Sequence, residues 1–215
     1  MMKETLTMKY KQIVFDIDGT LIDTEYAVIH SLQDTIAHLT GKNLTNEELI
    51  FILGITGEDA LRRLNIKNIE EALSLWDNNM KKYSRTVCVF NGIHELLKAL
   101  IKSGYEPGIV TSKTKKEFEH DFMVFDIASL FKTIICADDT AKHKPDPEPL
   151  LKYMELTKCS GRELLYIGDS IYDMECAKRA GTDFSFAQWG IKRTLNSNMA
   201  SFVTPFDAID KLIGK

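Results

Sequence analysis

The sequence lacks several features that mark whole classes of protein. Its 215 residues include only four cysteines, and none of them forms a CxxC pair or a Cys/His cluster with zinc-ligand spacing. Isolated cysteines of this kind are typical of buried residues in a reducing compartment. No apolar run approaches the roughly 20 residues that span a bilayer, and residues 1–11 lack the apolar core of a signal peptide. We therefore expect a cytoplasmic protein with no membrane partner.

A surplus of positive charge is also missing. The chain has 27 Lys and Arg against 31 Asp and Glu, which gives a net charge of −4. Nucleic acid is bound by surplus cations, so it is not expected as a partner. A small anionic substrate stays open, since a metal ion can invert the local charge. Apolar residues make up 44% of the chain and the mean hydropathy is −0.15, values typical of a soluble protein with a sizeable core.

Short β-rich runs alternate with helical periodicity along most of the chain. The strands are expected at Gln12–Phe15, Pro107–Val110, Thr133–Cys136, Leu164–Ile167 and Phe184–Ala187. The helical patterns are Ile93–Lys102, Lys115–Val124, Glu148–Glu155 and Met174–Ala180. This alternation predicts an α/β fold with a parallel sheet covered on both faces.

One stretch interrupts the alternation. From about Thr24 to Thr86 we find no convincing strand, only helical candidates, at Glu25–Leu39, Asn46–Leu53, Glu58–Leu64 and Ile69–Tyr83. These helices are too many for one crossover, so covering a sheet face is a less favoured explanation than an inserted helical domain. We predict a core of residues 1–23 and 87–215 and a cap of residues 24–86, which stands over the carboxyl ends of the strands as a lid.

Four loops at the ends of the predicted strands carry chemically useful groups. They are Asp16-Ile17-Asp18-Gly19-Thr20, Thr111-Ser112, Lys144-Pro145 and Gly168-Asp169-Ser170, with Asp173 about one helical turn after Asp169. Alone, each has an ordinary explanation as a turn, a helix cap or the start of a helix. Ligands bind at the carboxyl ends of parallel strands, so the order and placement of all four loops favour one site over chance.

Together these groups suit phosphoryl transfer. Asp16 ends a strand and can act as the nucleophile. Asp18, two residues on, lies on the same side and can protonate the leaving oxygen and later deprotonate water. Mg²⁺ prefers oxygen ligands, which Asp16, Asp169 and the Asp18 carbonyl can supply.

The remaining loop residues suit the binding of the phosphoryl group. Thr111 and Ser112, with nearby backbone N–H groups, suit the phosphoryl oxygens. Lys144 can hold both the nucleophile and a phosphoryl oxygen. Asp173 is expected to orient Lys144 or a metal-bound water from behind. Lys113 is close enough to Thr111 to affect the potential of the site.

These loops, in this order, resemble the four signature motifs of the haloacid dehalogenase superfamily, from Lys11 to about Leu212. The resemblance implies a Rossmann-like core, Mg²⁺, an aspartyl-phosphate at Asp16 and Asp18 as acid and base. Asp18 also separates this chain from the true dehalogenases, which lack a second aspartate. The insertion is similar to the cap of the subfamily that holds phosphoglycolate phosphatases, bacterial pyrophosphatases and β-phosphoglucomutase.

The resemblance places substrate specificity in the cap, at the loop containing Gly54, Thr56 and Gly57. Mutase relatives carry an Arg where this chain has Gly57 and a His where it has Val28, which weakens a mutase function. We expect a phosphatase acting on a small phosphorylated metabolite, similar to phosphoglycolate phosphatase, with a pyrophosphatase or a mutase-like phosphotransferase as alternatives. A regulatory protein that keeps the fold without catalysis is the alternative from another class. A monomer or weak dimer is expected.

Overall fold

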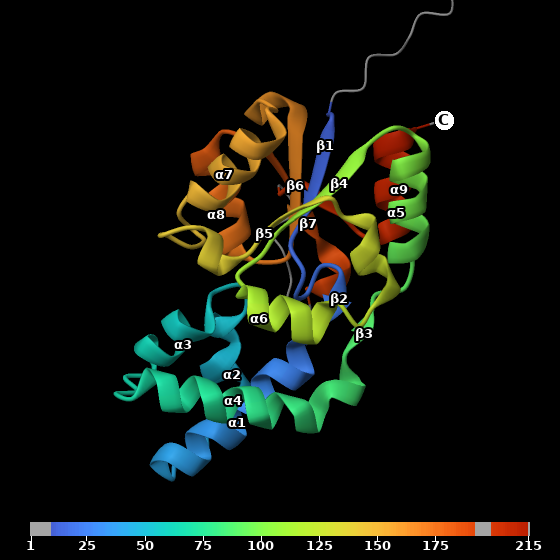
Figure 1. Cartoon of the computed structure of the whole chain (residues 1–215). Helices are drawn as coiled ribbons and strands as arrows, with labels where there is room; N and C mark the ends of the chain where they lie inside the picture. The colour runs from blue at the N-terminus through green and yellow to red at the C-terminus, as the bar shows by residue number, and fades with distance from the viewer. Residues whose placement is uncertain (1–9, 192–198, 215) are drawn as a thin grey trace, which may run out of the picture.

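The central strand of the protein is the predicted run β1 (Gln12–Phe15), which is buried on both faces. The computed structural model in Figure 1 describes residues 10–191 and 199–214. Six strands form one sheet in the order β5-β4-β1-β6-β7-β8, and every pairing in it is parallel. The other strands are β4 (Glu106–Val110), β5 (Thr133–Ile135), β6 (Leu164–Gly168), β7 (Asp183–Ala187) and β8 (Ser201–Phe202). The predicted α/β fold class is confirmed.

Helices cover both faces of the sheet (Figure 1). Side chains of a strand point alternately to its two faces, so Ile13 and Phe15 join the apolar cluster of one face while Val14 joins that of the other. The first cluster includes residues of α5 (Ile93–Lys102) and α9 (Pro205–Ile213), and the second includes residues of α7 (Glu148–Thr157) and α8 (Ile171–Ala180). The result is a three-layer core with β1 buried in the middle.

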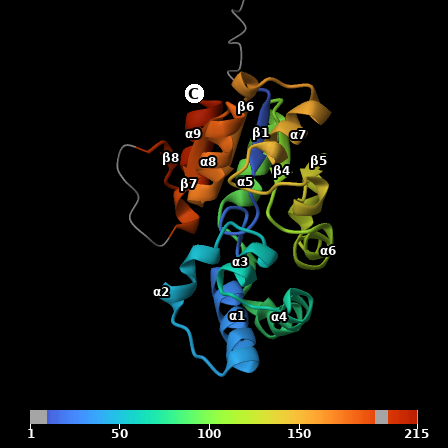
Figure 2. The same cartoon turned by 90° about the vertical axis from the view of Figure 1, so that its left-hand side faces the viewer.

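The chain between Asp23 and Cys88 forms a second body below the core in Figures 1 and 2. It contains α1 (Glu25–Thr40), α2 (Asn46–Leu49), α3 (Gly57–Arg63) and α4 (Ile69–Tyr83). An apolar cluster of its own, which includes Ile29, Leu32, Leu49 and Leu61, holds these helices together. Two short antiparallel strands, β2 (Ile22–Asp23) and β3 (Cys88–Val89), pair where the chain enters and leaves. We call this body the cap; its exact bounds at 24 and 86 stay a prediction.

Some elements differ from the sequence prediction. The helix expected over Lys115–Val124 is a short α6 (Lys115–Glu117) followed by a π-helical segment, Phe118–Phe122. Helix α8 begins at Ile171 rather than at Met174, because Ser170 caps it. Strands β2, β3 and β8 are two residues long, too short for a periodic pattern. Short 3₁₀ turns lie at Ile50–Ile52, Ser84–Thr86, Asp126–Leu130, Ala137–Asp139, Gly161–Glu163 and Gln188–Gly190.

Among residues 10–191 and 199–214, no helix has both the length and the apolar character needed to cross a membrane.

Candidate active site

The predicted site residues surround the point where the strand order of the sheet reverses. From β1 the chain continues to β4 and β5 on one side and then returns to β6 on the other. In open parallel sheets, ligands bind at the carboxyl ends of the strands at such a reversal. Asp16 directly follows β1, and its backbone N–H donates to the Ile167 carbonyl of β6 (2.9 Å). The nucleophile candidate is therefore fixed by the sheet itself.

Lys144 connects three of the four loops. Its ammonium nitrogen lies 2.9 Å from Asp16 Oδ1, 2.7 Å from Asp173 Oδ1 and 3.0 Å from the Tyr166 hydroxyl. All four side chains are almost completely buried. Burial alone would lower the pKa of Lys144, but the carboxylates of Asp16 and Asp173 outweigh it and raise the pKa. Lys144 is therefore a permanent cation that orients the carboxylate of Asp16.

Asp173 supports Lys144 from the first turn of α8. Ser170 and Asp173 form a capping box, in which the Asp173 carboxylate accepts from the Ser170 N–H (3.0 Å) and the Ser170 hydroxyl accepts from the Asp173 N–H (3.1 Å). The other carboxylate oxygen accepts from Lys144 (2.7 Å) and from the Tyr166 hydroxyl (2.8 Å). The structure thus places Asp173 in direct contact with Lys144; that Asp173 orients Lys144 for catalysis stays a prediction.

Tyr166 is a member of this network that sequence analysis missed. Tyr166 lies within β6, where the sequence pattern indicates only a buried strand residue. Its hydroxyl also donates to the Val110 carbonyl of β4 (2.8 Å). Burial raises the pKa of Tyr166 well above its usual range, and Asp173 adds to the effect, so the hydroxyl stays neutral.

Asp16, Asp169 and Asp173 form an acidic cluster that suits a divalent cation. One carboxylate oxygen from each lies within 4.8 Å of the others. Gly19 makes room for it, because a β-carbon there would overlap the Asp169 carboxylate. Burial raises the pKa of Asp16 to about 7, and burial with the neighbouring Asp173 and Asp16 raises that of Asp169. Lys144 brings one positive charge to these three carboxylates. Mg²⁺ bound to their oxygens would supply the rest.

Asp18 lies on the outer side of the site, paired with a buried lysine. Lys113 is only 8% exposed, and its ammonium nitrogen lies 3.2 Å from Asp18 Oδ1 and 3.1 Å from Asp121 Oδ2. Burial opposes the charge of Lys113, but the two carboxylates overcome it and raise its pKa. Burial alone would raise the pKa of Asp121, but Lys113 and His120 outweigh this effect and lower it. Asp121 was missed because it lies on the π-helical segment, outside the four motifs.

The side chains of Thr111 and Ser112 contact different parts of the protein. Thr111 follows β4 and is buried, and its hydroxyl accepts from the Lys113 N–H (3.2 Å). The Ser112 hydroxyl donates to the Gly54 carbonyl of the cap (3.0 Å). Thr111 therefore lies deep in the core beside the strand end, whereas Ser112 joins the core to the cap.

A cavity of about 170 Å³ opens between this site and the cap. Asp16, Asp18, Ser112 and Lys113 line its core side, and Gly54 and Gly57 are among the residues of its cap side. Gly54 has a positive φ of 94°, and a β-carbon there would press on the Ser170 side chain, so glycine is required where cap meets core. The volume is below the about 300–1,000 Å³ of pockets for drug-sized ligands, which indicates a small substrate.

Thr56 does not line this cavity, although it was expected beside Gly54 and Gly57 to contact substrate. It caps α3, where its hydroxyl accepts from the Asp59 N–H (3.2 Å) and donates to Asp59 Oδ2 (2.9 Å). Its side chain is buried, so both hydrogen-bonding functions of the hydroxyl are used inside the cap. The structure gives Thr56 a part in shaping the loop.

The model of the haloacid dehalogenase-like hydrolase family matches residues 13–187. The chain belongs to this family. The match spans all four loops and the cap, and the geometry above brings those loops to one edge of the sheet.

Relatives of this hydrolase carry names from the branches that its cap resembles. The pyrophosphatase PpaX of Bacillus velezensis is 31% identical over 181 residues, 84% of each chain. A Lactobacillus plantarum structure described as a candidate phosphoglycolate phosphatase has a TM-score of 0.83 at 28% identity, over 94% of this chain and 99% of that one. A candidate β-phosphoglucomutase from Thermotoga maritima, with a TM-score of 0.73 and 22% identity over 94% and 98% of the chains, shares the fold. The chain is a hydrolase of the phosphatase type.

The acidic cluster predicts how stability depends on pH when no metal is supplied. The pKa of Asp16 is raised from 3.8 to about 7 in the folded protein, so protonation of Asp16 favours folding. The stabilisation from this protonation is complete below the pKa that Asp16 has in the unfolded chain. It is lost as the pH rises through the pKa of about 7 that Asp16 has in the folded protein. In EDTA, the Tm of wild type should fall between about pH 5 and pH 8 by at least about 3 °C more than that of Asp16→Asn.

Mg²⁺ should raise the Tm more at the higher pH, where the carboxylates are ionised, than at the lower. Thermal unfolding of both proteins, followed by circular dichroism with EDTA and with Mg²⁺, measures each of these shifts. Parallel pH profiles for wild type and Asp16→Asn in EDTA would show that Asp16 does not carry the effect.

Proposed function

We propose that this hydrolase is a Mg²⁺-dependent phosphatase that cleaves a small phosphorylated metabolite through an aspartyl-phosphate at Asp16. The observation that carries the proposal is the buried contact of Lys144 with Asp16 and Asp173, next to Asp169 and at the floor of a cavity that also exposes Asp18. A protein that only kept the fold would have no need for a buried cation aimed at an aspartate at the end of a strand.

The residues have distinct parts in the two steps. A carboxylate oxygen of Asp16 attacks phosphorus, the bond from phosphorus to the leaving oxygen breaks, and Asp18 gives that oxygen a proton. Water then attacks the phosphorus of the aspartyl-phosphate, Asp18 takes a proton from it, and the bond to Asp16 breaks to release phosphate. Lys144 keeps the Asp16 carboxylate oriented through both steps. Lys113 and Asp121 hold Asp18 at the cavity wall.

Mg²⁺ would be held by the carboxylates of Asp16 and Asp169 and the main-chain oxygen of Asp18, and would neutralise charge on the phosphoryl oxygens when bound. Thr111 and Lys144 complete the proposed phosphate site. Ser112 has a lesser part, because its hydroxyl already donates to Gly54.

The alternative phosphotransfer functions differ in the group that leaves the phosphorus. Pyrophosphate hydrolysis is a second candidate, since the Bacillus velezensis relative is named a pyrophosphatase, and phosphoglycolate is a third, from the Lactobacillus plantarum relative. A phosphosugar mutase is disfavoured because Val28 and Gly57 both line the cavity, where mutase relatives have a His and an Arg. We propose a small phosphorylated metabolite as the partner, a cytoplasmic monomer or weak dimer as the working form, and no role in binding nucleic acid.

Phosphate release from p-nitrophenyl phosphate tests the proposal. Activity should require Mg²⁺, should be lost in EDTA, and should return when Mg²⁺ is restored. Asp18→Asn should lower kcat by at least about 100-fold, the usual contribution of a general acid and base. Asp210→Asn, on the exposed face of α9, is the matched control and should behave like wild type. Equal activity in EDTA, or an Asp18→Asn enzyme as fast as wild type, would refute the assignment.

A further inference from the structure

The cavity beside Asp16 and Asp18 has two unlike halves. The core half is charged, with Lys113, Lys116, Glu117 and Asp121 around the two aspartates. Most residues of the cap half are apolar, namely Val28, Ile52, Leu53, Ile55, Leu73, Trp76 and Met80. Gly54, Gly57 and the charged Asp77 and Lys81 complete it. If the phosphoryl group lies at Asp16, the group it leaves behind extends toward this apolar wall.

The indole nitrogen of Trp76, the side-chain donor of the apolar wall, is already paired inside the cap. The indole N–H of Trp76 donates to the Ser31 hydroxyl (2.8 Å). That hydroxyl in turn faces Met80 Sδ (3.0 Å) and the Val28 carbonyl (3.1 Å). The indole N–H and the Ser31 hydroxyl are therefore held by one another and by the cap. An anion placed against this wall would lose its hydration without gaining hydrogen bonds, which is costly.

The three lysines that line the cavity also have polar partners. Lys113 is held by Asp18 and Asp121, and Lys116 Nζ lies 2.6 Å from Asp77 Oδ2. Lys81 is exposed and donates to Asn78 Oδ1 (3.0 Å). Among the described residues that line the cavity there are three lysines and His120, whose ring nitrogen lies 3.0 Å from Asp121 Oδ1. They stand against the five carboxylates of Asp16, Asp18, Asp77, Glu117 and Asp121. A second anionic group on the substrate would have to compete with these partners for each of the three lysines.

We infer that the leaving group is uncharged and apolar: the substrate is the phosphate monoester of a small alcohol with an aromatic or branched hydrocarbon group, rather than pyrophosphate or a phosphorylated acid. The apolar group packs on Trp76 and Leu73, where burial of its apolar surface favours binding. The cavity volume of about 170 Å³ limits the group to one ring or a short branched chain. This inference rests on the proposed phosphatase activity.

Benzyl phosphate and phosphoglycolate make a matched pair to test it. Both are phosphate esters of a primary alcohol, and they differ in whether a phenyl ring or a carboxylate follows the CH₂ group. We expect kcat/KM for benzyl phosphate to exceed that for phosphoglycolate and for pyrophosphate by at least about 30-fold, the size of the packing gain less the cost of ordering the ring.

A substitution in the wall gives a second readout. Leu73→Lys places an ammonium among the apolar side chains, so it should lower kcat/KM for benzyl phosphate and raise it for phosphoglycolate. Together these changes should lower the ratio of kcat/KM for benzyl phosphate to kcat/KM for phosphoglycolate by at least about tenfold. Leu151→Lys, on the exposed face of α7, is the matched control and should keep the wild-type ratio. Circular dichroism establishes whether Leu73→Lys folds; if it does not, the wild-type substrate pair decides alone.

The outcomes separate the two proposals. Turnover of p-nitrophenyl phosphate together with an equal or higher kcat/KM for phosphoglycolate or pyrophosphate would overturn the apolar leaving group and leave the phosphatase standing. A folded Leu73→Lys enzyme with an unchanged ratio would also overturn it. Failure to turn over any of the four phosphates with Mg²⁺ would overturn both.

Discussion

Asp16→Asn should lower kcat by at least about 10⁴-fold, because it removes the carboxylate directly after β1 that we propose as the nucleophile. The amide has nearly the same shape, and its oxygen can still accept a hydrogen bond from Lys144. The pKa of Asp16 is raised by burial, so loss of its charge does not weaken the folded state at neutral pH. The expected result is a folded protein that binds substrate and does not turn it over.

The measurement is a single-turnover assay of phosphate release with excess enzyme, which detects slow residual chemistry. Circular dichroism spectra and Tm values that match those of wild type, or exceed them in EDTA, show that the fold is intact. An Asp16→Asn enzyme whose kcat is within about tenfold of wild type would rule out a nucleophile at this position.

Lys144→Met is expected to destabilise the protein by about 3–5 kcal/mol, the cost of leaving buried charges without their partner. Methionine fills a similar volume, so the loss measures charge rather than packing. Without the ammonium, Asp16 and Asp173 face each other and Asp169 with no cation among them. In EDTA near pH 8 we expect a Tm at least about 6 °C below that of wild type.

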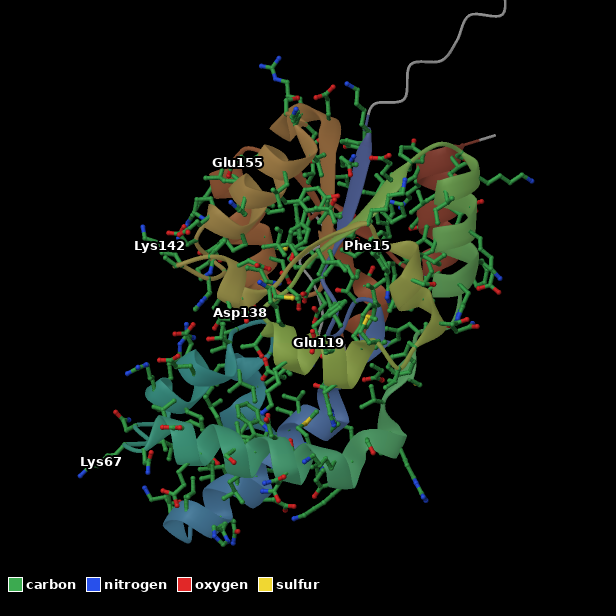
Figure 3. The ribbon with its side chains drawn as sticks, in the orientation of Figure 1. Phe15, Lys67, Glu119, Asp138, Lys142 and Glu155 are labelled. Carbon is green, nitrogen blue, oxygen red and sulfur yellow. The ribbon has the colours of Figure 1, made fainter. Side chains whose placement is uncertain are left out.

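Lys142→Met is the matched control for this variant. Lys142 lies two residues away in the sequence but on the outer surface of the core (Figure 3), in an exposed ion pair with Asp146 at 3.6 Å. Exposed pairs contribute about 0–1 kcal/mol, so its Tm should stay close to that of wild type. The deficit of Lys144→Met should shrink near pH 5, where the carboxylates take up protons, and on addition of Mg²⁺. Equal Tm values for the two variants would contradict the buried network.

The sheet and its site could be predicted because both follow local rules. Each core strand is an apolar run that ends at a polar loop, and the carboxyl ends of parallel strands meet at one edge. This is why Asp16 and Lys144, 128 residues apart, could be expected at one site before any contact was known. Helix α4 could also be predicted from its local pattern, since its predicted bounds, Ile69–Tyr83, are those observed.

Tertiary contacts decided what the sequence could not show. The letter of Tyr166 indicates only a buried strand residue. The sheet places β4 and β6 on either side of β1, and this arrangement brings the Tyr166 hydroxyl to Lys144 and to Val110. Asp121 depends on π-helical turns that no periodic pattern announces. Thr56 was expected to contact substrate, but a capping hydrogen bond turns its side chain into the cap. The apolar wall of the cavity arises from helices α1 and α4 and the segment Ile52–Ile55, which approach one another only in the folded chain.

The central claim is that a phosphoryl group is carried by Asp16. The most direct measurement is mass spectrometry of the peptide that contains residues 12–23. Asp18→Asn enzyme is mixed with Mg²⁺ and p-nitrophenyl phosphate, whose nitrophenolate leaves without a proton from Asp18, and is quenched in acid. The variant lacks the base for the second step, so the account predicts that this peptide gains the mass of one phosphoryl group at Asp16 and loses it with hydroxylamine. Phosphate released by wild type with no label on Asp16 in the variant, or with the label on another residue, would contradict it.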